Sequence, residues 1–290
     1  MKFSWNELKR WYRNPLINPQ TNRKIKQNGP TYQKLKDAYD HVQKGRYSYS
    51  LGAFQIRTKG EDYFILQENN GFLWASVFDG HAGHHVAEFL QKNTINMFKK
   101  ISSSETVMPD VLFHTYAALE KEIQKMGLPS GSTATTLLIH PKTKKAYLAN
   151  TGDSRIIGCL EGKAVPLTND HKPKQMDEYK RIRAAGDDVV FSGTWRVGSL
   201  AVSRVFGDLD VKASNPSVIA TPEIFTYNLK GFSHFVLASD GLYDVCSNEE
   251  IIKFIMQRRR MEPNKIAKEL AHLARDKGSQ DDITVIIVQL

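Results

Sequence analysis

Short apolar runs separated by turn-forming residues dominate the chain from Leu51 onward. Runs of this length that are bounded by Gly, Asn or Asp predict β-strands. The dipeptides Thr151-Gly152 and Glu161-Gly162 lie between successive runs and suit hairpin turns, which favours antiparallel pairing. The predicted strands cover residues 72–78, 132–139, 146–150, 155–160, 235–239 and 283–288.

Between these runs, apolar residues recur every three or four positions, the spacing of a helix with one buried face. Asp110 is placed to cap one of these helices, and Ser247 and Glu250 form a capping-box pattern at the start of another. Strands joined by hairpins, with helices grouped in pairs, predict an α+β domain built on antiparallel sheet. The apolar stripes of the predicted helices lie in residues 86–97, 112–126, 251–255 and 266–273.

The first 46 residues differ from the rest of the chain in charge. They hold 11 Lys and Arg against 3 acids, a net charge of +8, whereas the other 244 residues hold 29 against 28, a net charge of +1. Helical spacing of apolar residues predicts a short helix over residues 31–42, and residues 45–50 suit a linker. We therefore expect a small basic segment over residues 1–46 and a large domain over residues 50–290.

Composition narrows the class of protein. Hydrophobic residues make up 41% of the 290 positions, which is enough for a domain with a substantial core. The two cysteines, Cys159 and Cys246, are too far apart for a zinc-ligand motif or a disulfide framework, which favours a reducing intracellular compartment. No apolar run is long enough to form a transmembrane segment, and the N-terminus lacks a signal-peptide core.

Acidic residues stand at the ends of three predicted strands. Asp79-Gly80 and Asp240-Gly241 follow apolar runs, and Asp281-Asp282 precedes one. Carboxylates at strand ends can converge at one edge of a sheet, where they repel each other unless cations lie among them, and hard oxygens select Mg²⁺ or Mn²⁺. Glycine after the aspartate leaves room for a cation or phosphate near the backbone. Because an Asp-Gly pair alone also suits an ordinary turn, the metal interpretation depends on the remaining pattern.

Eight motifs, which include these three acidic pairs, set that pattern. Together they resemble the metal-dependent protein phosphatases, the type 2C serine/threonine phosphatases, in order along residues 50–290. The resemblance implies a four-layer αββα fold, in which a central antiparallel β-sandwich of two sheets is flanked by helix pairs on both sides. It also implies hydrolysis of phosphoserine and phosphothreonine in proteins. The motifs are Gln55-Ile56-Arg57 with Glu61-Asp62; Val77-Phe78-Asp79-Gly80-His81-Ala82-Gly83; Gly131-Ser132-Thr133-Ala134; Ala149-Asn150-Thr151-Gly152-Asp153-Ser154-Arg155; Leu167-Thr168-Asn169-Asp170-His171-Lys172-Pro173; Leu200-Ala201-Val202-Ser203-Arg204 with Phe206-Gly207-Asp208; Ala238-Ser239-Asp240-Gly241-Leu242-Tyr243-Asp244-Val245; and Ser279-Gln280-Asp281-Asp282-Ile283-Thr284-Val285.

By this resemblance, five residues bind two divalent cations, Mg²⁺ or Mn²⁺. Asp79 would bridge the two cations, with the Gly80 carbonyl on one of them. Asp240 and Asp281 would bind the other, and Glu61 would act through water. A water molecule between two cations loses its proton easily and can attack phosphorus in line.

Two more positions match acids that support a third, weaker cation in some members of the family, namely Asp153 and Asp244. Asp153 suits the cap of a turn equally well. One residue departs from the family, because Asp282 stands where asparagine is usual. This leaves a choice between Asp281 and Asp282 as the metal ligand, and the register of the motif favours Asp281.

The resemblance also assigns catalytic roles to Arg57 and His81. Arg57 would grip the phosphate with its two-pronged guanidinium, and the alternative is a surface arginine on an exposed strand. His81 would protonate the leaving serine or threonine oxygen, and the alternative is a histidine that orders the loop.

The basic segment carries a second resemblance. Residues 14–35 resemble a two-cysteine adaptor module found in proteins of large DNA viruses, although its two cysteines are absent here. The resemblance implies a viral enzyme, packaged in the virion, and the alternative is a basic linker that increases solubility. Its charge suits an acidic partner or nucleic acid.

The sequence thus predicts a Mg²⁺- or Mn²⁺-dependent serine/threonine protein phosphatase, a monomer that acts on phosphoprotein substrates. The alternative is a catalytically weak phosphatase-fold module that binds phosphoproteins, whose expected mark is the loss of metal-binding acids. A third hypothesis is nucleic-acid binding through residues 1–46.

Overall fold

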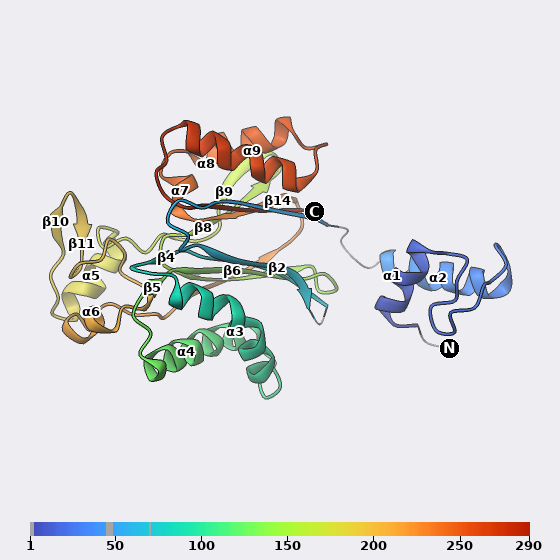
Figure 1. Cartoon of the computed structure of the whole chain (residues 1–290), viewed down its shortest axis with the longest axis horizontal. Coiled ribbons are helices and arrows are strands. Elements are labelled where there is room, and N and C mark those ends of the chain that lie inside the picture. Colours follow the sequence, from blue (N-terminus) through green and yellow to red (C-terminus); the bar gives the residue numbers. More distant parts are fainter. Residues whose placement is uncertain (1–2, 45–48, 70) are drawn as a thin grey trace. The chain divides into compact units, whose positions relative to one another are not determined.

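The computed structural model describes residues 3–44, 49–69 and 71–290, and the chain divides into two compact units (Figure 1). The larger unit contains Tyr49–His140 and Lys145–Leu290. Residues 45–48 of the predicted linker lie outside the described residues.

Two five-stranded antiparallel sheets form the centre of the larger unit. The first has the order β1 (Ser50–Ile56), β15 (Ile283–Gln289), β14 (Phe232–Ala238), β8 (Arg155–Leu160) and β9 (Lys163–Pro166). The second has the order β13 (Glu223–Asn228), β7 (Lys145–Thr151), β6 (Ala134–His140), β3 (Phe72–Phe78) and β2 (Tyr63–Asn69).

Pairs of helices cover the outer faces of the two sheets. The pair α3 (His85–Ser102) and α4 (Met108–Met126) packs on the second sheet, and the pair α8 (Asn248–Gln257) and α9 (Pro263–Asp276) packs on the first (Figure 1). Each pair buries its apolar stripe against a sheet, as the helical spacing predicts. The four-layer αββα sandwich of the α+β class is therefore confirmed.

The position of β15 follows directly from its sequence. It is a continuous apolar run, and residues 283–288 are all buried. A strand without polar alternation is covered on both faces, which fits its place between β1 and β14. Asp281 and Asp282 therefore enter a strand inside the sheet rather than one at its rim.

Shorter elements complete the larger unit around one end of the sandwich. They are the small sheet of β12 (Phe206–Gly207), β5 (Gly131–Ser132) and β4 (Gly80–His81), the hairpin of β10 (Val190–Ser192) and β11 (Thr194–Arg196), and the helices α5 (Met176–Ala184), α6 (Leu209–Ser214) and α7 (Asp240–Tyr243).

Two local predictions about helix starts have different outcomes. The capping box before α8 is confirmed, because Ser247 Oγ accepts the Glu250 N–H at 3.2 Å and the Glu250 carboxylate accepts the Ser247 N–H at 2.9 Å. The prediction that Asp110 caps α4 is wrong. The helix begins two residues earlier, after Val107, and Asp110 lies in its first turn, where its charge suits the helix dipole.

The turn at Thr151-Gly152 does not form the predicted hairpin. β7 belongs to the second sheet and β8 to the first, so this turn carries the chain from one sheet to the other. Gly152 has a φ of +103°, a conformation that favours glycine. The Glu161-Gly162 turn does close a hairpin, between β8 and β9. Asp153 therefore lies on a loop that links the two sheets.

The smaller unit contains α1 (Trp5–Arg13) and α2 (Pro30–Lys44), and α2 confirms the helix predicted over residues 31–42. Leu8, Trp11 and Leu35 are buried together and form a core of its own. None of the helices in residues 3–44, 49–69 and 71–290 combines the length and the apolar character needed to cross a membrane.

Candidate metal centre

The predicted metal-binding acids come from strand ends of both sheets and influence one another electrostatically. Asp79 directly follows β3, and Asp240 follows β14 after one residue. Burial, and then the charges of Asp62, Asp240, Asp153 and Asp281, raises the pKa of Asp79 well above its ordinary value. These carboxylates therefore act on one another electrostatically in the folded chain.

Asp240 lies in the same cluster of acids. Burial, followed by the charges of Asp153 and Asp244, raises the pKa of Asp240 to about 8, although nearby Lys172 opposes the shift. Asp153 is buried and Asp244 is exposed at the end of α7. The charges of the two predicted third-metal residues therefore act on the Asp240 carboxylate.

Asp62 also acts on this group of acids, although the family resemblance gave this residue no role. It is 1% exposed, and its Oδ2 accepts a hydrogen bond from Thr284 at 2.7 Å, whereas its Oδ1 is buried without a hydrogen-bond partner. Burial, more than the charge of Asp282, raises the pKa of Asp62 to about 7. The signal in the sequence was its place directly before strand β2, like that of Asp281-Asp282 before β15.

These residues fit hard divalent cations by the chemistry of their donors. The cluster offers carboxylate oxygens, including the unpartnered buried oxygen of Asp62, and such donors suit Mg²⁺ and Mn²⁺. Within the described residues, no three acidic, histidine or cysteine side chains already stand in a metal-binding arrangement. The chemistry of the donor set thus fits the predicted cations.

Two lysines partly balance the negative charge. Lys59 Nζ lies 2.9 Å from Asp281 Oδ2, and Lys172 forms an ion pair with Asp153. The Lys59–Asp281 pair is exposed, so water screens it and it can be exchanged for another cation at little cost. Asp281 is therefore held by a replaceable partner.

The Asp282 carboxylate is hydrogen-bonded by backbone N–H groups. Its two carboxylate oxygens accept five N–H groups at 2.5–3.2 Å, and its side chain is 2% exposed. Burial raises the pKa of Asp282, but the backbone N–H donors outweigh it and the pKa lies below the ordinary value. Between the two adjacent acids, Asp281 is the one available to a cation. The donors to Asp282 are Thr58, Lys59, Gly60, Glu61 and Asp62.

Glycine is required after Asp79 and Asp240 for a reason that differs from the prediction that it leaves room for a cation or phosphate. A Cβ on Gly80 would lie 2.5 Å from the Glu61 carbonyl oxygen, and one on Gly241 would lie 2.1 Å from the Asp282 carbonyl oxygen. The space beside each glycine is therefore filled by the protein's own backbone, not left for a cation. Both glycines let the acid-bearing segments approach one another.

Arg57 and Glu61 lie on the loop that Asp282 holds. Arg57 is exposed, its Nε donates to Gln55 at 2.8 Å, and its guanidinium lies 5.7 Å from the centre of the Tyr63 ring. Glu61 accepts the backbone N–H of Gly83 at 2.6 Å. Glu61 therefore ties the loop to the segment that carries Asp79 and His81.

His81 has a carboxylate partner that the sequence analysis did not identify. Its Nε2 lies 2.7 Å from Oδ2 of Asp208, which is 8% exposed. Burial lowers the pKa of His81, but the hydrogen bond and charge of Asp208 outweigh it, so the pKa is raised above its ordinary value. The signal was an acid directly after a glycine, in the motif Phe206-Gly207-Asp208.

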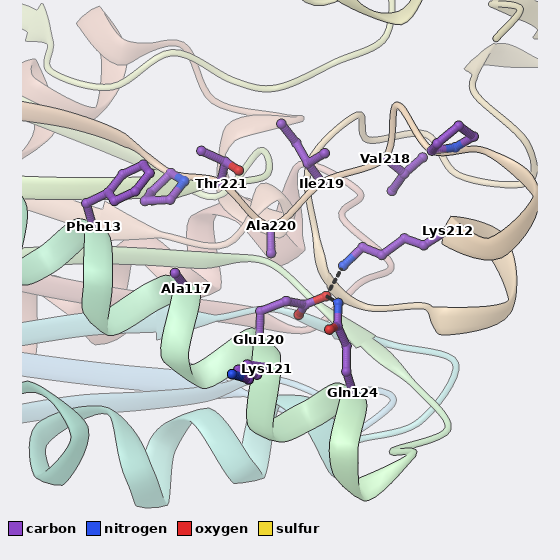
Figure 2. A pocket seen from close by; sticks show the side chains of 12 residues that line it. Phe113, Ala117, Glu120, Lys121, Gln124, Lys212, Val218, Ile219, Ala220 and Thr221 are labelled. Carbon is purple, nitrogen blue, oxygen red and sulfur yellow. Dashed lines mark hydrogen bonds and ion pairs between the residues drawn. The ribbon is translucent and has the colours of Figure 1, made fainter. Parts of the chain in front are cut away.

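A groove of about 580 Å³ lies beside α4 (Figure 2), and two of its lining residues, Glu120 and Lys212, support the segment that leads to Asp208. None of the residues that line it is a predicted ligand or catalytic group. Figure 2 shows Lys212 paired with Glu120, at 2.5 Å, and Glu120 also accepts the Gly207 N–H at 3.1 Å. This buried pair fixes the backbone one residue before Asp208.

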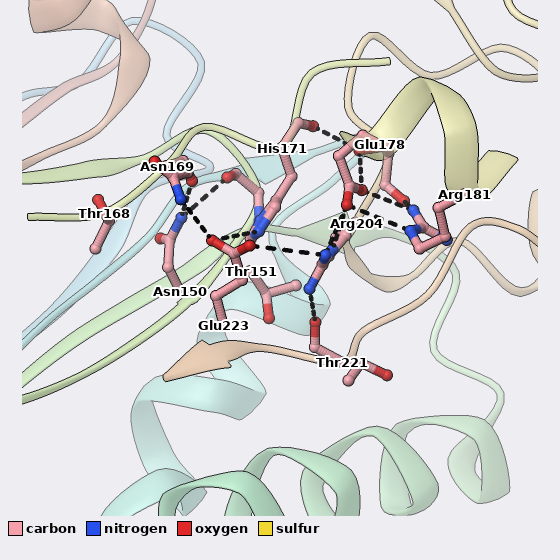
Figure 3. Close-up of polar contacts among 12 residues, drawn as sticks. Asn150, Thr151, Thr168, Asn169, His171, Glu178, Arg181, Arg204, Thr221 and Glu223 are labelled. Carbon is pink, nitrogen blue, oxygen red and sulfur yellow. Dashed lines mark hydrogen bonds and ion pairs between the residues drawn. The ribbon is translucent and has the colours of Figure 1, made fainter. Parts of the chain in front are cut away.

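A buried polar network supports the loop that carries Asp153 (Figure 3). His171 is 1% exposed, and its ring Nδ1 accepts the Gly152 N–H at 3.0 Å. The backbone N–H of His171 donates to the Gly152 carbonyl at 3.0 Å. Glu178 binds Arg181 and Arg204 in the same view, at 2.7 and 2.6 Å. The turn before Asp153 is therefore rigidly held.

Asp282→Asn should destabilise the protein even though it restores the residue usual in the family. One amide nitrogen would face backbone N–H donors, and buried donors left without acceptors cost about 1–3 kcal/mol. Asp281→Asn removes only an exposed ion pair and should leave the unfolding free energy within about 0.5 kcal/mol of wild type. Urea unfolding in EDTA measures the unfolding free energy of both variants. A stable Asp282→Asn together with an unstable Asp281→Asn would mean that Asp281 has the structural role and Asp282 is the acid available to a cation.

Comparison with known protein families gives two matches. The family described as protein phosphatase 2C matches residues 50–283, and the 2-cysteine adaptor domain matches residues 9–37. Both resemblances seen in the sequence are thereby confirmed.

Curated relatives and solved structures agree with the first match. Probable protein phosphatase 2C 11 of Arabidopsis thaliana is 37% identical over 257 residues, which cover 84% of this chain and 67% of the relative. Probable protein phosphatase 2C 7 of Oryza sativa subsp. japonica is 37% identical over 256 residues, covering 84% and 66%, so the chain spans about two thirds of each.

In structure, the chain is similar to a C. elegans sex determining protein, with a TM-score of 0.77, 21% identity and coverage of 98% of this chain and 80% of the other. A phosphatase from a pathogenic strain of Toxoplasma gondii gives a TM-score of 0.73, 24% identity and coverage of 85% and 94%. These two likenesses show the fold. With the family match over most of the chain and the plant relatives, they establish that the chain belongs to the protein phosphatase 2C family and has the serine/threonine protein phosphatase function of that family.

Proposed function

We propose that Asp79, Asp240 and Asp281, with the carbonyl of Gly80, hold two divalent cations, Mg²⁺ or Mn²⁺, for the hydrolysis of phosphoserine and phosphothreonine in proteins. The observation that supports this is the raised pKa of Asp79, which burial and four neighbouring acids produce. Such a cluster is unfavourable unless positive charge enters it. Glu61 would contribute through water.

Asp153 and Asp244 would support a third, weaker cation near Asp240, and the rise in the pKa of Asp240 that each charge causes supports this part of the proposal. Asp153 would have to exchange Lys172 for that cation, because the two form an ion pair. When bound, the two principal cations would supply a water molecule with a lowered pKa and would offset charge on the phosphoryl oxygens.

The chain's own groups account for substrate binding and the leaving group. The exposed guanidinium of Arg57 is proposed to bind the phosphate through its bidentate face. His81 is proposed to donate a proton to the departing serine or threonine oxygen, with Asp208 holding the ring by its 2.7 Å contact.

The alternative, a phosphatase-fold module that binds phosphoproteins without turnover, requires the loss of metal-binding acids. Every predicted acid is present in the sequence, so nothing favours it. Calorimetry that found tight phosphopeptide binding with no phosphate release would support this alternative over catalysis.

We further propose a reducing intracellular location and packaging in a virion. Cys159 and Cys246 are both free thiols, which suits a reducing compartment. The viral origin rests on the adaptor match alone, because the relatives named above come from plants. Absence of the protein from purified virus particles, measured by proteomics, would remove that proposal.

Asp79→Asn or Asp240→Asn should reduce Mn²⁺-dependent phosphate release from a phosphothreonine peptide at least about 100-fold, because each removes a charged metal ligand. The metal-free variants should melt no lower than wild type, since each relieves repulsion within the cluster. Asp276→Asn, at an exposed acid that ends α9, is the matched control. Activity that survived both changes, or survived EDTA, would contradict the metal assignment.

Asp208→Asn should separate two substrates by their leaving groups. A phosphothreonine peptide needs a proton on the leaving oxygen, so its kcat should fall about 100-fold. p-Nitrophenyl phosphate releases an already stable anion, so its kcat should change less than about threefold. His81→Gln should show the same split. Equal losses on both substrates would mean that the Asp208–His81 pair has only a structural role.

A further inference from the structure

The smaller unit presents a basic surface, and Glu7 and Asp37 are engaged within the unit itself. Residues 3–44 hold nine Lys and Arg and three acids. Glu7 accepts the Ser4 N–H in the capping box of α1, at 2.6 Å, and Asp37 accepts Gln33 Nε2 at 2.8 Å. Positive charge is therefore the dominant property that this unit offers to a partner.

An aromatic stack lies on the same unit. The rings of Tyr12 and Tyr39 lie parallel, with centroids 4.6 Å apart and planes inclined by 4°. Tyr39 also contacts Trp11, which is buried and donates its Nε1–H to the Pro15 carbonyl at 2.9 Å. Tyr12 is 63% exposed, so the stack is anchored in the core at one end and open to solvent at the other.

Cationic residues occur within one helical turn of the two tyrosines on both helices. Lys9 is one turn before Tyr12 on α1, and Lys36 is one turn before Tyr39 on α2, a spacing that puts neighbours on one helical face. Arg13 follows Tyr12 directly and is exposed. A flat, open ring and several cations therefore occur together.

We propose that this surface, defined by Tyr12, Tyr39, Lys9, Arg13 and Lys36, binds single-stranded nucleic acid. An unpaired base can stack on the open face of Tyr12 while the phosphates meet the cations. An acidic protein segment would satisfy the charge but would leave the ring without a planar partner. In a duplex the bases are already stacked on one another and cannot cover Tyr12.

Fluorescence anisotropy on the full chain tests this proposal with labelled single strands of about 15 nucleotides. If about three phosphates are neutralised, affinity should fall roughly 20-fold between about 50 and 200 mM salt. Tyr12→Ala should weaken binding at least about fivefold, and Tyr12→Phe, which keeps the ring, should not.

Charge reversal provides the second arm. Arg13→Glu with Lys36→Glu should weaken binding more than about tenfold, whereas Lys99→Glu with Lys100→Glu, a matched pair at the exposed end of α3, should change it less than about twofold. All variants should retain activity on p-nitrophenyl phosphate, which shows that the larger unit is intact and keeps this test separate from the phosphatase assignment.

Three results would overturn the proposal. They are no binding at the lower salt concentration, equal affinity for duplex and single strand, and equal sensitivity to Tyr12→Ala and Tyr12→Phe. Competition by polyglutamate as effective as competition by unlabelled oligonucleotide, with Tyr12→Ala neutral, would assign the surface to an acidic protein instead.

Discussion

The removal of several carboxylates from water, together with the repulsion among them, is the constraint on which the architecture of the larger unit depends. Asp79, Asp62 and Asp240 all have raised pKa values, with burial as the main cause and neighbouring acids as the second. Isolated carboxylates could not be gathered in this way without a rigid scaffold, since burying charge is costly. The sandwich supplies that scaffold, because the acids extend from strands that are hydrogen-bonded inside two sheets.

The chain counters this repulsion with backbone groups and with lysines. Asp282 accepts five backbone N–H groups, so one carboxylate of the region is fully satisfied and organises the loop of Arg57 and Glu61. Lys59 and Lys172 pair with acids that a divalent cation could take over. The same charge pattern therefore stabilises the metal-free fold and leaves the site open to cations.

The two units use charge in opposite ways. In the larger unit, burial and the negative charges of Asp62 and Asp240 raise the pKa of Asp79, and such carboxylates would suit compact, highly charged cations. In the smaller unit, positive side chains are spread along two helices around an open aromatic stack, which suits an extended polyanion. A phosphatase with a separate basic surface would gain a means of localising its activity.

The elements themselves could be predicted from the sequence, because periodicity and turn signals are local properties. The runs that became β3, β14 and β15, and the acids at their ends, were visible at once, and ordered motifs identified the family. The sequence could not show that Thr151-Gly152 crosses between sheets, or that Asp62 and Asp208 belong to the site. It also left open whether Asp281 or Asp282 is available to a metal. That choice depends on backbone donors more than two hundred residues away, such as Glu61, and only the folded chain brings them to Asp282.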